Sequence, residues 1–151
     1  MKARSLRVYG FLENSDGDLL IAYERFQGQP LIKFPGGGIE WGEGHQEALC
    51  REFMEELGVS IAVKECVYFN DFPVQSAINP TYQVQSFFYR VALLESEVPQ
   101  TVQTETIREV PMEEGERFVW VPKTELDGVP FTFEIEQAAI RAYLAVAKNL
   151  Q

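Results

Sequence analysis

Three glutamates lie close together in the segment Arg51-Glu52-Phe53-Met54-Glu55-Glu56. Glu52, Glu55 and Glu56 occupy positions i, i+3 and i+4, so on a helix their carboxylates project from one face. Like charges at this spacing repel each other, and anions in the last turn of a helix oppose its dipole. A divalent cation bound by several oxygens removes both penalties. The cluster therefore favours a metal site over the alternative, a solvated acidic face.

The type of metal follows from the donor atoms. Mg²⁺ keeps several waters and binds one or two carboxylates together with substrate phosphates, which suits glutamates on one helix face. His45 is the only histidine, and Cys50 and Cys66 do not have the spacing of a zinc pair. We expect His45 to be an exposed residue of the first helical turn and both cysteines to be small buried residues. Mg²⁺ is therefore the expected cofactor.

The carboxylates need a helix and a loop to position them. Gly44 to Leu57 has the apolar periodicity of a helix, and Gly58 follows at the usual C-terminal stop position. The short strand 31–34 precedes the helix and is stopped by Pro35 and the three glycines 36–38. Glycines permit a close approach of the backbone that larger residues forbid. We therefore expect a glycine loop beside the helix.

The rest of the chain has the pattern of further strands and one closing helix. Strands 6–12 and 19–26 flank the turn-prone residues Asn14 to Gly17 and predict a hairpin. The other expected elements are strands 59–69, 82–94 and 118–121, a loop over 95–115 and an amphipathic helix over 134–147. With no repeat and no Pro/Ser linker, residues 1–151 are expected to form a single domain of α/β (α+β) class, with a mixed sheet between helices.

Composition and charge limit the class of function. The chain has 151 residues, of which 46% are apolar, enough for a packed core. Its net charge is −10, with 23 acidic and 13 basic residues, which argues against binding of nucleic acid polymers. No run of ~18 apolar residues predicts a membrane span, and no signal peptide is evident. A cytoplasmic protein that binds small anions through a cation is expected.

Nine positions match the Nudix box, Gly-x5-Glu-x7-Arg-Glu-U-x-Glu-Glu-x-Gly-U. They are Gly37, Glu43, Arg51, Glu52, Phe53, Glu55, Glu56, Gly58 and Val59. The chain therefore resembles the Nudix hydrolases, which have an αβα sandwich fold, and the order of the expected strands and helices resembles that fold too. Phe53 stands where an aliphatic residue is more usual.

The resemblance implies roles for the residues of the box. Glu52, Glu55 and Glu56 become ligands of Mg²⁺, or of Mn²⁺ as a substitute, and the Gly36 carbonyl becomes a further ligand. Glu52 and Glu56 are the catalytic candidates, with Glu52 as general base or bridging ligand. Gly37 belongs to the loop beside them.

Two roles lie outside the carboxylate trio. Glu43 and Arg51 resemble the pair that braces this loop against the helix, so they are classed with Gly37 as supporting residues. Some relatives take one more glutamate from a later loop. Glu114 is chosen here, because it precedes Trp120 as such a glutamate does in those relatives; a solvated acidic loop is the alternative.

The implied activity is Mg²⁺-dependent hydrolysis of a nucleoside diphosphate linked to another group, most similar to the nucleoside-triphosphate pyrophosphohydrolases of housecleaning type. The alternative within the fold is a non-catalytic module that senses nucleotides or binds proteins, in which the box acids would be eroded; here all are retained. An acidic Ca²⁺-binding protein would need an Asp-rich loop, which is absent. The substrate-binding residues are unknown from the sequence, and a homodimer is left open.

Overall fold

The computed structural model describes residues 1–26, 28–76, 79–95, 97–99, 102–104, 115–132 and 134–149. Within these residues the chain forms eight strands, two α-helices and one 3₁₀ helix. They are β1 (Ala3–Leu12), β2 (Leu19–Phe26), β3 (Gln29–Lys33), β4 (Gly36–Gly38), α1 (His45–Leu57), β5 (Ile61–Phe69), β6 (Val74–Gln75), β7 (Tyr82–Leu93), β8 (Gly115–Val121), the 3₁₀ helix η1 (Lys123–Gly128) and α2 (Glu134–Asn149).

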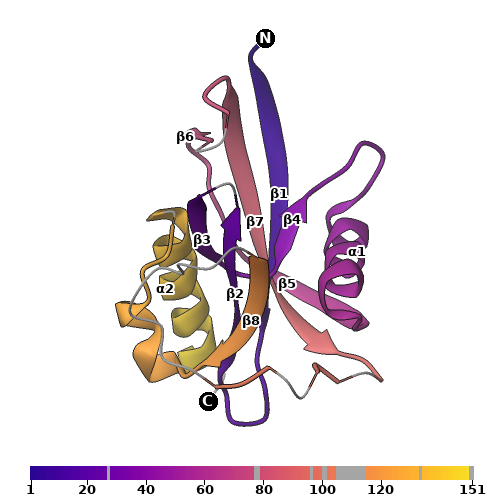
Figure 1. Cartoon of the computed structure of the whole chain (residues 1–151), viewed down its shortest axis with the longest axis vertical. Coiled ribbons are helices and arrows are strands. Elements are labelled where there is room, and N and C mark those ends of the chain that lie inside the picture. Colours follow the sequence, from indigo (N-terminus) through magenta and orange to yellow (C-terminus); the bar gives the residue numbers. More distant parts are fainter. Residues whose placement is uncertain are drawn as a thin grey trace.

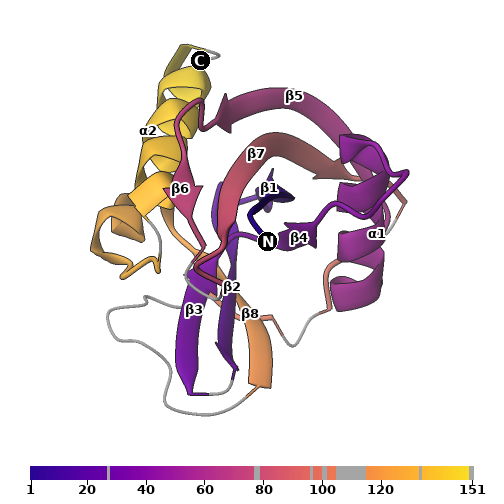
Figure 2. The ribbon, with the colours of Figure 1, turned by 90° about the horizontal axis from the view of Figure 1, so that it is seen from above.

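The strands form two sheets. One has the order β4-β1-β7-β5, with β6 paired to β7, and the other has the order β3-β2-β8. In the first sheet β1 and β7 run parallel, while the other neighbours are antiparallel, so this sheet is mixed as expected. Figure 1 shows α1 and α2 on opposite sides of the strands, and Figure 2 shows the same arrangement from above. The predicted α+β class and αβα layering are confirmed.

Each helix closes its own part of the core. The buried residues of α1 pack with Val8 of β1, Leu20 of β2 and Trp120 of β8. Phe53 is fully buried there, which is worth ~1.5–3 kcal/mol. A Cβ at Gly10 would lie 2.8 Å from the Phe53 ring, so this glycine makes room for the aromatic side chain. The unusual aromatic residue of the box therefore fits because Gly10 of β1 has no side chain.

The core beneath α2 is rich in aromatic rings. Phe11, Phe34, Phe88 and Tyr143 are buried there, and the Phe11 ring lies 4.6 Å from both the Phe34 and the Tyr143 rings. Ring pairs at this distance add to the stability that burial itself provides. These aromatics belong to the core.

The hairpin expected between residues 6–12 and 19–26 is wrong. The turn itself forms, since the Asn14 side chain accepts the backbone N–H groups of Asp16 and Asp18. Beyond one bridge between Glu13 and Leu19, however, the two strands separate into different sheets. Both edges of β1 are occupied, by β4 on one side and β7 on the other, so β2 has no edge of β1 to pair with.

Four further expectations need correction. The glycines 36–38 form a strand, not a loop, because they pair with residues 7–9 of β1. The last expected strand, 118–121, starts too late, since β8 begins at Gly115. Cys66 is exposed and Cys50 only partly buried. His45 is corrected below. None of the described helices is long and apolar enough to cross a membrane.

Candidate active site

Helix α1 places the glutamates because both of its ends are well defined. It begins after Gly44, whose N–H is accepted by the Glu47 side chain at 3.3 Å. It ends at Gly58, which has φ +69° and donates its N–H to the Met54 carbonyl at 3.0 Å. With these ends fixed, Glu52 lies in the middle of the helix and Glu56 in its last turn.

The glycine strand β4 lies directly against the helix. A Cβ at Gly37 would lie 2.6 Å from Glu52 Oε1 and 2.7 Å from its Cδ, so the carboxylate fills the space that a side chain would need. Gly36 has φ +147°, and a Cβ there would lie 2.1 Å from the Val8 carbonyl oxygen. A side chain at Gly36 is excluded by the backbone, whereas a side chain at Gly37 would displace the Glu52 carboxylate.

Arg51 joins the helix to the chain before it. Its Nε and Nη2 donate to the two carboxylate oxygens of Glu43 at 2.7 and 2.9 Å, and Nη2 also donates to the Gly38 carbonyl at 3.0 Å. Its Nη1 donates to Glu52 Oε1 at 3.1 Å and to Glu55 Oε2 at 3.3 Å. These charge-assisted bonds lower the pKa of Glu43 and hold Glu52 in place.

Glu56 is held in a different environment. Its Oε2 is buried and has no hydrogen-bond partner among the residues that the structure describes. Burial raises the pKa of Glu56 to about 8, and the charges of Glu116 and Glu52 and a hydrogen bond to Glu52 add to this, while Lys33 opposes it. The site therefore holds a carboxylate whose negative charge is costly unless a cation is near.

The structure separates the three box glutamates. Glu52 and Glu56 interact with each other, whereas the Glu55 side chain is 58% exposed and bonded to Arg51. Within the described part of the chain, no three histidine, cysteine, aspartate or glutamate side chains converge on one point. In this arrangement of side chains Glu55 lies apart from the other two acids, and the role of the three carboxylates as metal ligands stays a prediction.

Two other expected residues have different outcomes. Glu114 lies outside the described residues. His45 is partly buried and not exposed, because its ring packs 4.2 Å from the Phe87 ring and its Nδ1 lies 2.9 Å from the Tyr89 hydroxyl. The aromatic strand β7, which is distant in sequence, covers this first turn.

Three charged residues near the acids were not identified from the sequence. Glu116 of β8 and Lys33 of β3 both act on the charge of Glu56, and Arg7 of β1 is influenced by Glu52 and Glu56. Partial desolvation raises the pKa of Glu116, and the charges of Glu24 and Glu52 raise it further. A strand extended back from residue 118 would have placed Glu116 in β8, but no local pattern indicates that Arg7, Lys33 and Glu116 come near the acids of α1.

The arrangement can therefore bind a cation and, beside it, an anion. Glu52 and Glu56 offer carboxylate oxygens on one side, and the basic groups of Arg7 and Lys33 lie near enough to act on their charges. A polyphosphate with a divalent cation carries both charges. Phosphate chemistry is the reaction class that such a site suits.

Comparison with known proteins agrees with this chemistry. The family model described as the NUDIX domain matches residues 3–144. An 8-oxo-dGTP diphosphatase of Haemophilus influenzae is 30% identical over 125 residues, which cover 81% of this chain and 79% of that protein.

Solved structures show the same fold. The MutT protein of Methanosarcina mazei Go1 superposes with a TM-score of 0.70 at 16% identity, covering 95% of this chain and 96% of that one. The ORF135 protein of E. coli superposes with a TM-score of 0.68 at 22% identity, covering 97% and 92%. With its domain match over residues 3–144, the chain belongs to the Nudix family and is a Nudix diphosphohydrolase.

Proposed function

We propose that the protein is a nucleoside-triphosphate pyrophosphohydrolase of housecleaning type that uses Mg²⁺, with Mn²⁺ as a substitute. The products are a nucleoside monophosphate and pyrophosphate. The observation that carries this proposal is the seating of the Glu52 carboxylate against the Gly37 backbone, with Glu56 beside it. The similarity to the 8-oxo-dGTP diphosphatase supports the triphosphate as the substrate class.

The residues of the site fit a divalent cation. Glu52, Glu55, Glu56 and the Gly36 carbonyl offer only oxygen donors, which Mg²⁺ prefers. The buried Oε2 of Glu56 lacks a hydrogen-bond partner in the described part of the chain, and a cation would satisfy it. The desolvation and like charges that raise the pKa of Glu56 would be offset in the same way. When bound, Mg²⁺ neutralises charge on the phosphate oxygens and lowers the pKa of a coordinated water.

The chain's own residues then have separate tasks. A water oxygen forms a bond to one phosphorus, the P–O bond of the anhydride breaks, and the water's proton passes to a carboxylate. Glu52 is proposed as that general base or as a bridging ligand, and Glu56 as the second catalytic carboxylate. Arg51, fixed by Glu43, holds the Glu52 carboxylate in one position by its bond at 3.1 Å.

Two acids are candidates for a further ligand or base from outside the box. Glu114 stays a prediction as the ligand or base from outside the box. Glu116, two residues later, is a described acid whose charge acts on Glu56. It is therefore the second candidate for that role, and separate Gln variants at the two positions distinguish them by which one loses activity.

The experiment that tests the proposal is a substrate screen with Mg²⁺ and with Mn²⁺. Nucleoside triphosphates, dinucleoside polyphosphates, ADP-ribose and nucleotide sugars are compared, and release of phosphate and of pyrophosphate is measured. We expect pyrophosphate from triphosphates, and none in excess EDTA. Hydrolysis of only the other classes would refute the triphosphate assignment. Binding without any hydrolysis would favour the non-catalytic sensing module. A cytoplasmic location and a homodimer stay predictions.

A further inference from the structure

Two arginines lie near the acids of α1, and they differ in how many of their donors are in use. Arg51 bonds through all three of its guanidinium nitrogens to groups of the protein. Arg7 uses only its Nε, which donates to the Tyr9 hydroxyl at 2.6 Å. Within the described residues, the Nη1 and Nη2 groups of Arg7 have no hydrogen-bond partner. Arg7 is therefore the arginine that keeps donors for a ligand.

The Tyr9 hydroxyl holds the Arg7 guanidinium in one place. Tyr9 is only 5% exposed, and its ring stacks on that of Phe88 at 5.2 Å. A Cβ at Gly36 would lie 2.8 Å from the Tyr9 Cα, so Tyr9 also packs closely against β4. A hydroxyl fixed in the core is a rigid acceptor, and its bond to Nε orients the two Nη groups.

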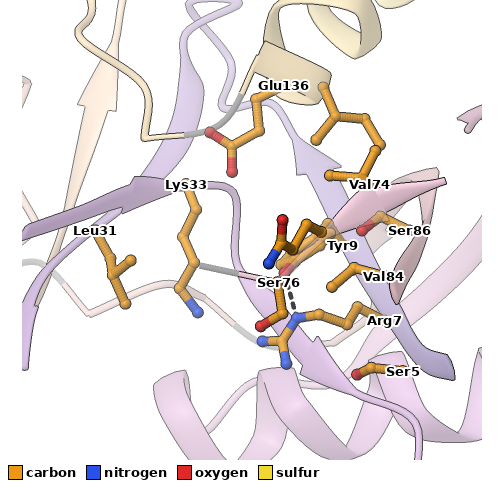
Figure 3. A pocket seen from close by; sticks show the side chains of 12 residues that line it. Ser5, Arg7, Tyr9, Leu31, Lys33, Val74, Ser76, Val84, Ser86 and Glu136 are labelled. Atoms are coloured by element: carbon orange, nitrogen blue, oxygen red, sulfur yellow. Dashed lines mark hydrogen bonds between the residues drawn. The ribbon is translucent and has the colours of Figure 1, made fainter. Parts of the chain in front are cut away.

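The free donors of Arg7 border an open hollow (Figure 3). The hollow lies between β1, β3, β7 and the start of α2, and with its open mouth included it has a volume of about 700 Å³. Lys33 of β3 and Glu136 of α2 line it together with Arg7 and Tyr9 of β1. Figure 3 shows the Arg7 side chain extending toward α1, with its bond to Tyr9 as a dashed line. A ligand that enters the hollow at this end therefore reaches the guanidinium.

The acids of α1 act on Arg7 without contacting it. Burial lowers the pKa of Arg7, but Tyr9 and the negative charges of Glu52 and Glu56 raise it by more. Among the described residues, Arg7 nevertheless forms no ion pair with either glutamate. A Cβ at Gly38 would lie 3.8 Å from Arg7 Nη1, so the missing side chain leaves this part of β4 open beside the guanidinium. A gap therefore separates the basic group from the two carboxylates.

We propose that Arg7 is a catalytic residue that binds the phosphate oxygens of the substrate through Nη1 and Nη2, and that Tyr9 is its positioning residue. This inference rests on the proposed function, because it needs the diphosphate to lie at the acids of α1. A guanidinium donates two parallel N–H groups to a phosphate and always keeps its charge. Lys33, the other basic group near Glu56, offers a point charge without such a fork.

The charge of Arg7 is needed most in the transition state. As the water oxygen bonds to phosphorus, the P–O bond of the anhydride breaks and its electron pair moves onto the leaving oxygen, while the water's proton passes to a carboxylate. Negative charge then builds up on phosphate oxygens beside Glu52 and Glu56. A guanidinium that is already fixed across the gap stabilises this charge without reorganising.

The kinetic test compares Arg7→Gln with Arg4→Gln on a substrate that the screen identifies. Both variants remove one positive charge from β1, but Arg4 is exposed. We expect kcat of Arg7→Gln to fall about 10²- to 10³-fold with little change in KM, and Arg4→Gln to behave as wild type. Equal kcat values for the two variants overturn the proposal.

Arg7→Lys tests the fork itself and carries the decision if Arg7→Gln does not fold. Lysine keeps the charge and loses the paired donors, so kcat should stay about 10-fold or more below wild type. A lysine variant within about 3-fold of wild type shows that charge alone suffices, and overturns binding through Nη1 and Nη2.

Tyr9→Phe tests the positioning role. It removes the hydroxyl and keeps the ring in the core. We expect kcat to fall about 10-fold in the wild-type background and to stay unchanged in the Arg7→Gln background, because Tyr9 acts through Arg7. Equal falls in the two backgrounds overturn the positioning role.

Two binding measurements do not depend on turnover. Calorimetry with Mn²⁺ alone should show that Arg7→Gln binds the ion at least as tightly as wild type, because the lost positive charge repelled it. With Mn²⁺ present, the affinity of this variant for inorganic pyrophosphate should be about 10-fold or more weaker, because pyrophosphate contains either the attacked phosphorus or the leaving oxygen. Weaker Mn²⁺ binding, or unchanged pyrophosphate binding, overturns the contact between Arg7 and phosphate.

The same measurements separate this inference from the proposed function. Triphosphate hydrolysis that Arg7→Gln leaves unchanged overturns the inference and keeps the proposed function. Pyrophosphate binding that depends on Arg7, in a protein that hydrolyses no triphosphate, supports the Arg7 site and overturns the proposed function.

Discussion

Replacement of Gly37 by alanine should separate activity from stability. The new Cβ would lie 2.6 Å from Glu52 Oε1, and an ordinary contact begins at 3.4 Å. The carboxylate must therefore retreat by about 0.8 Å from its position against β4. The Gly37 backbone does not need a positive φ, so alanine fits the local conformation. The clash is with the end of a side chain, and Glu52 can move without unfolding the protein.

The expected magnitudes follow from that displacement. A misplacement of this size can cost about 100-fold in kcat when the group takes part in the reaction. A Gly-to-Ala change at an unstrained position stabilises by ~0.4–1 kcal/mol through the unfolded chain. This gain opposes the cost of moving Glu52, so Tm should change by no more than about 4 °C for a chain of this size. We therefore expect kcat to fall about 100-fold with Tm nearly unchanged.

The matched control is Gly38→Ala, one residue along the same strand. A Cβ there would meet only the Arg7 guanidinium, at 3.8 Å, which is an ordinary contact. Its kcat should stay within about 3-fold of wild type. Steady-state kinetics and thermal melts of both variants, on a substrate from the screen, make the comparison. Equal losses in the two variants, or a Gly37→Ala enzyme as active as wild type, would refute the role given to the Glu52–Gly37 contact.

Three other variants test the rest of the site. Gly36→Ala should unfold or melt far below wild type, by ~3 kcal/mol or more in urea titrations, because its Cβ would meet the Val8 carbonyl at 2.1 Å and its φ is +147°. Glu52→Gln should lower kcat by about 10²- to 10⁴-fold at little changed KM, whereas Glu47→Gln in the first turn should not. In EDTA, the raised pKa of Glu56 means that its contribution to stability is complete below its ordinary value of 4.5 and is lost as pH rises to about 8. Tm of the wild type should fall over that range, and Tm of Glu56→Gln should fall less.

The first helix and its neighbours could be predicted because their signals are local. Apolar periodicity places Phe53 and Leu57 in the core, and Gly58 ends the helix in the left-handed conformation that glycine favours. The spacing of Glu52 and Glu56 within one helix also fixes that they share a face. None of these features depends on a partner that is distant in sequence.

Strand pairing could not be predicted in the same way. Val8 pairs with Gly37 on one side and with Phe87 on the other, and neither partner is adjacent in sequence. The turn residues at Asn14 predict that the chain reverses direction, and this was interpreted as a hairpin. They do not indicate whether the two strands that follow and precede the turn pair with each other. The glycines of β4 have low strand propensity, and only the free edge of β1 makes them a strand.

The same distinction explains why the box predicts the reaction and not the substrate. Alternation along β3 places Lys33 on the face opposite Ile32, whose side chain lies in the core, and this much follows from the sequence. That Glu136 lies across from that face depends on the bonds between Ile32 and Thr132, which join residues 100 positions apart. The proposed diphosphate site rests on one helix and one strand, whereas the hollow that Lys33 and Glu136 line is assembled from the strands β1, β3, β6 and β7 and a second helix, so its residues cannot be identified from one segment of the sequence.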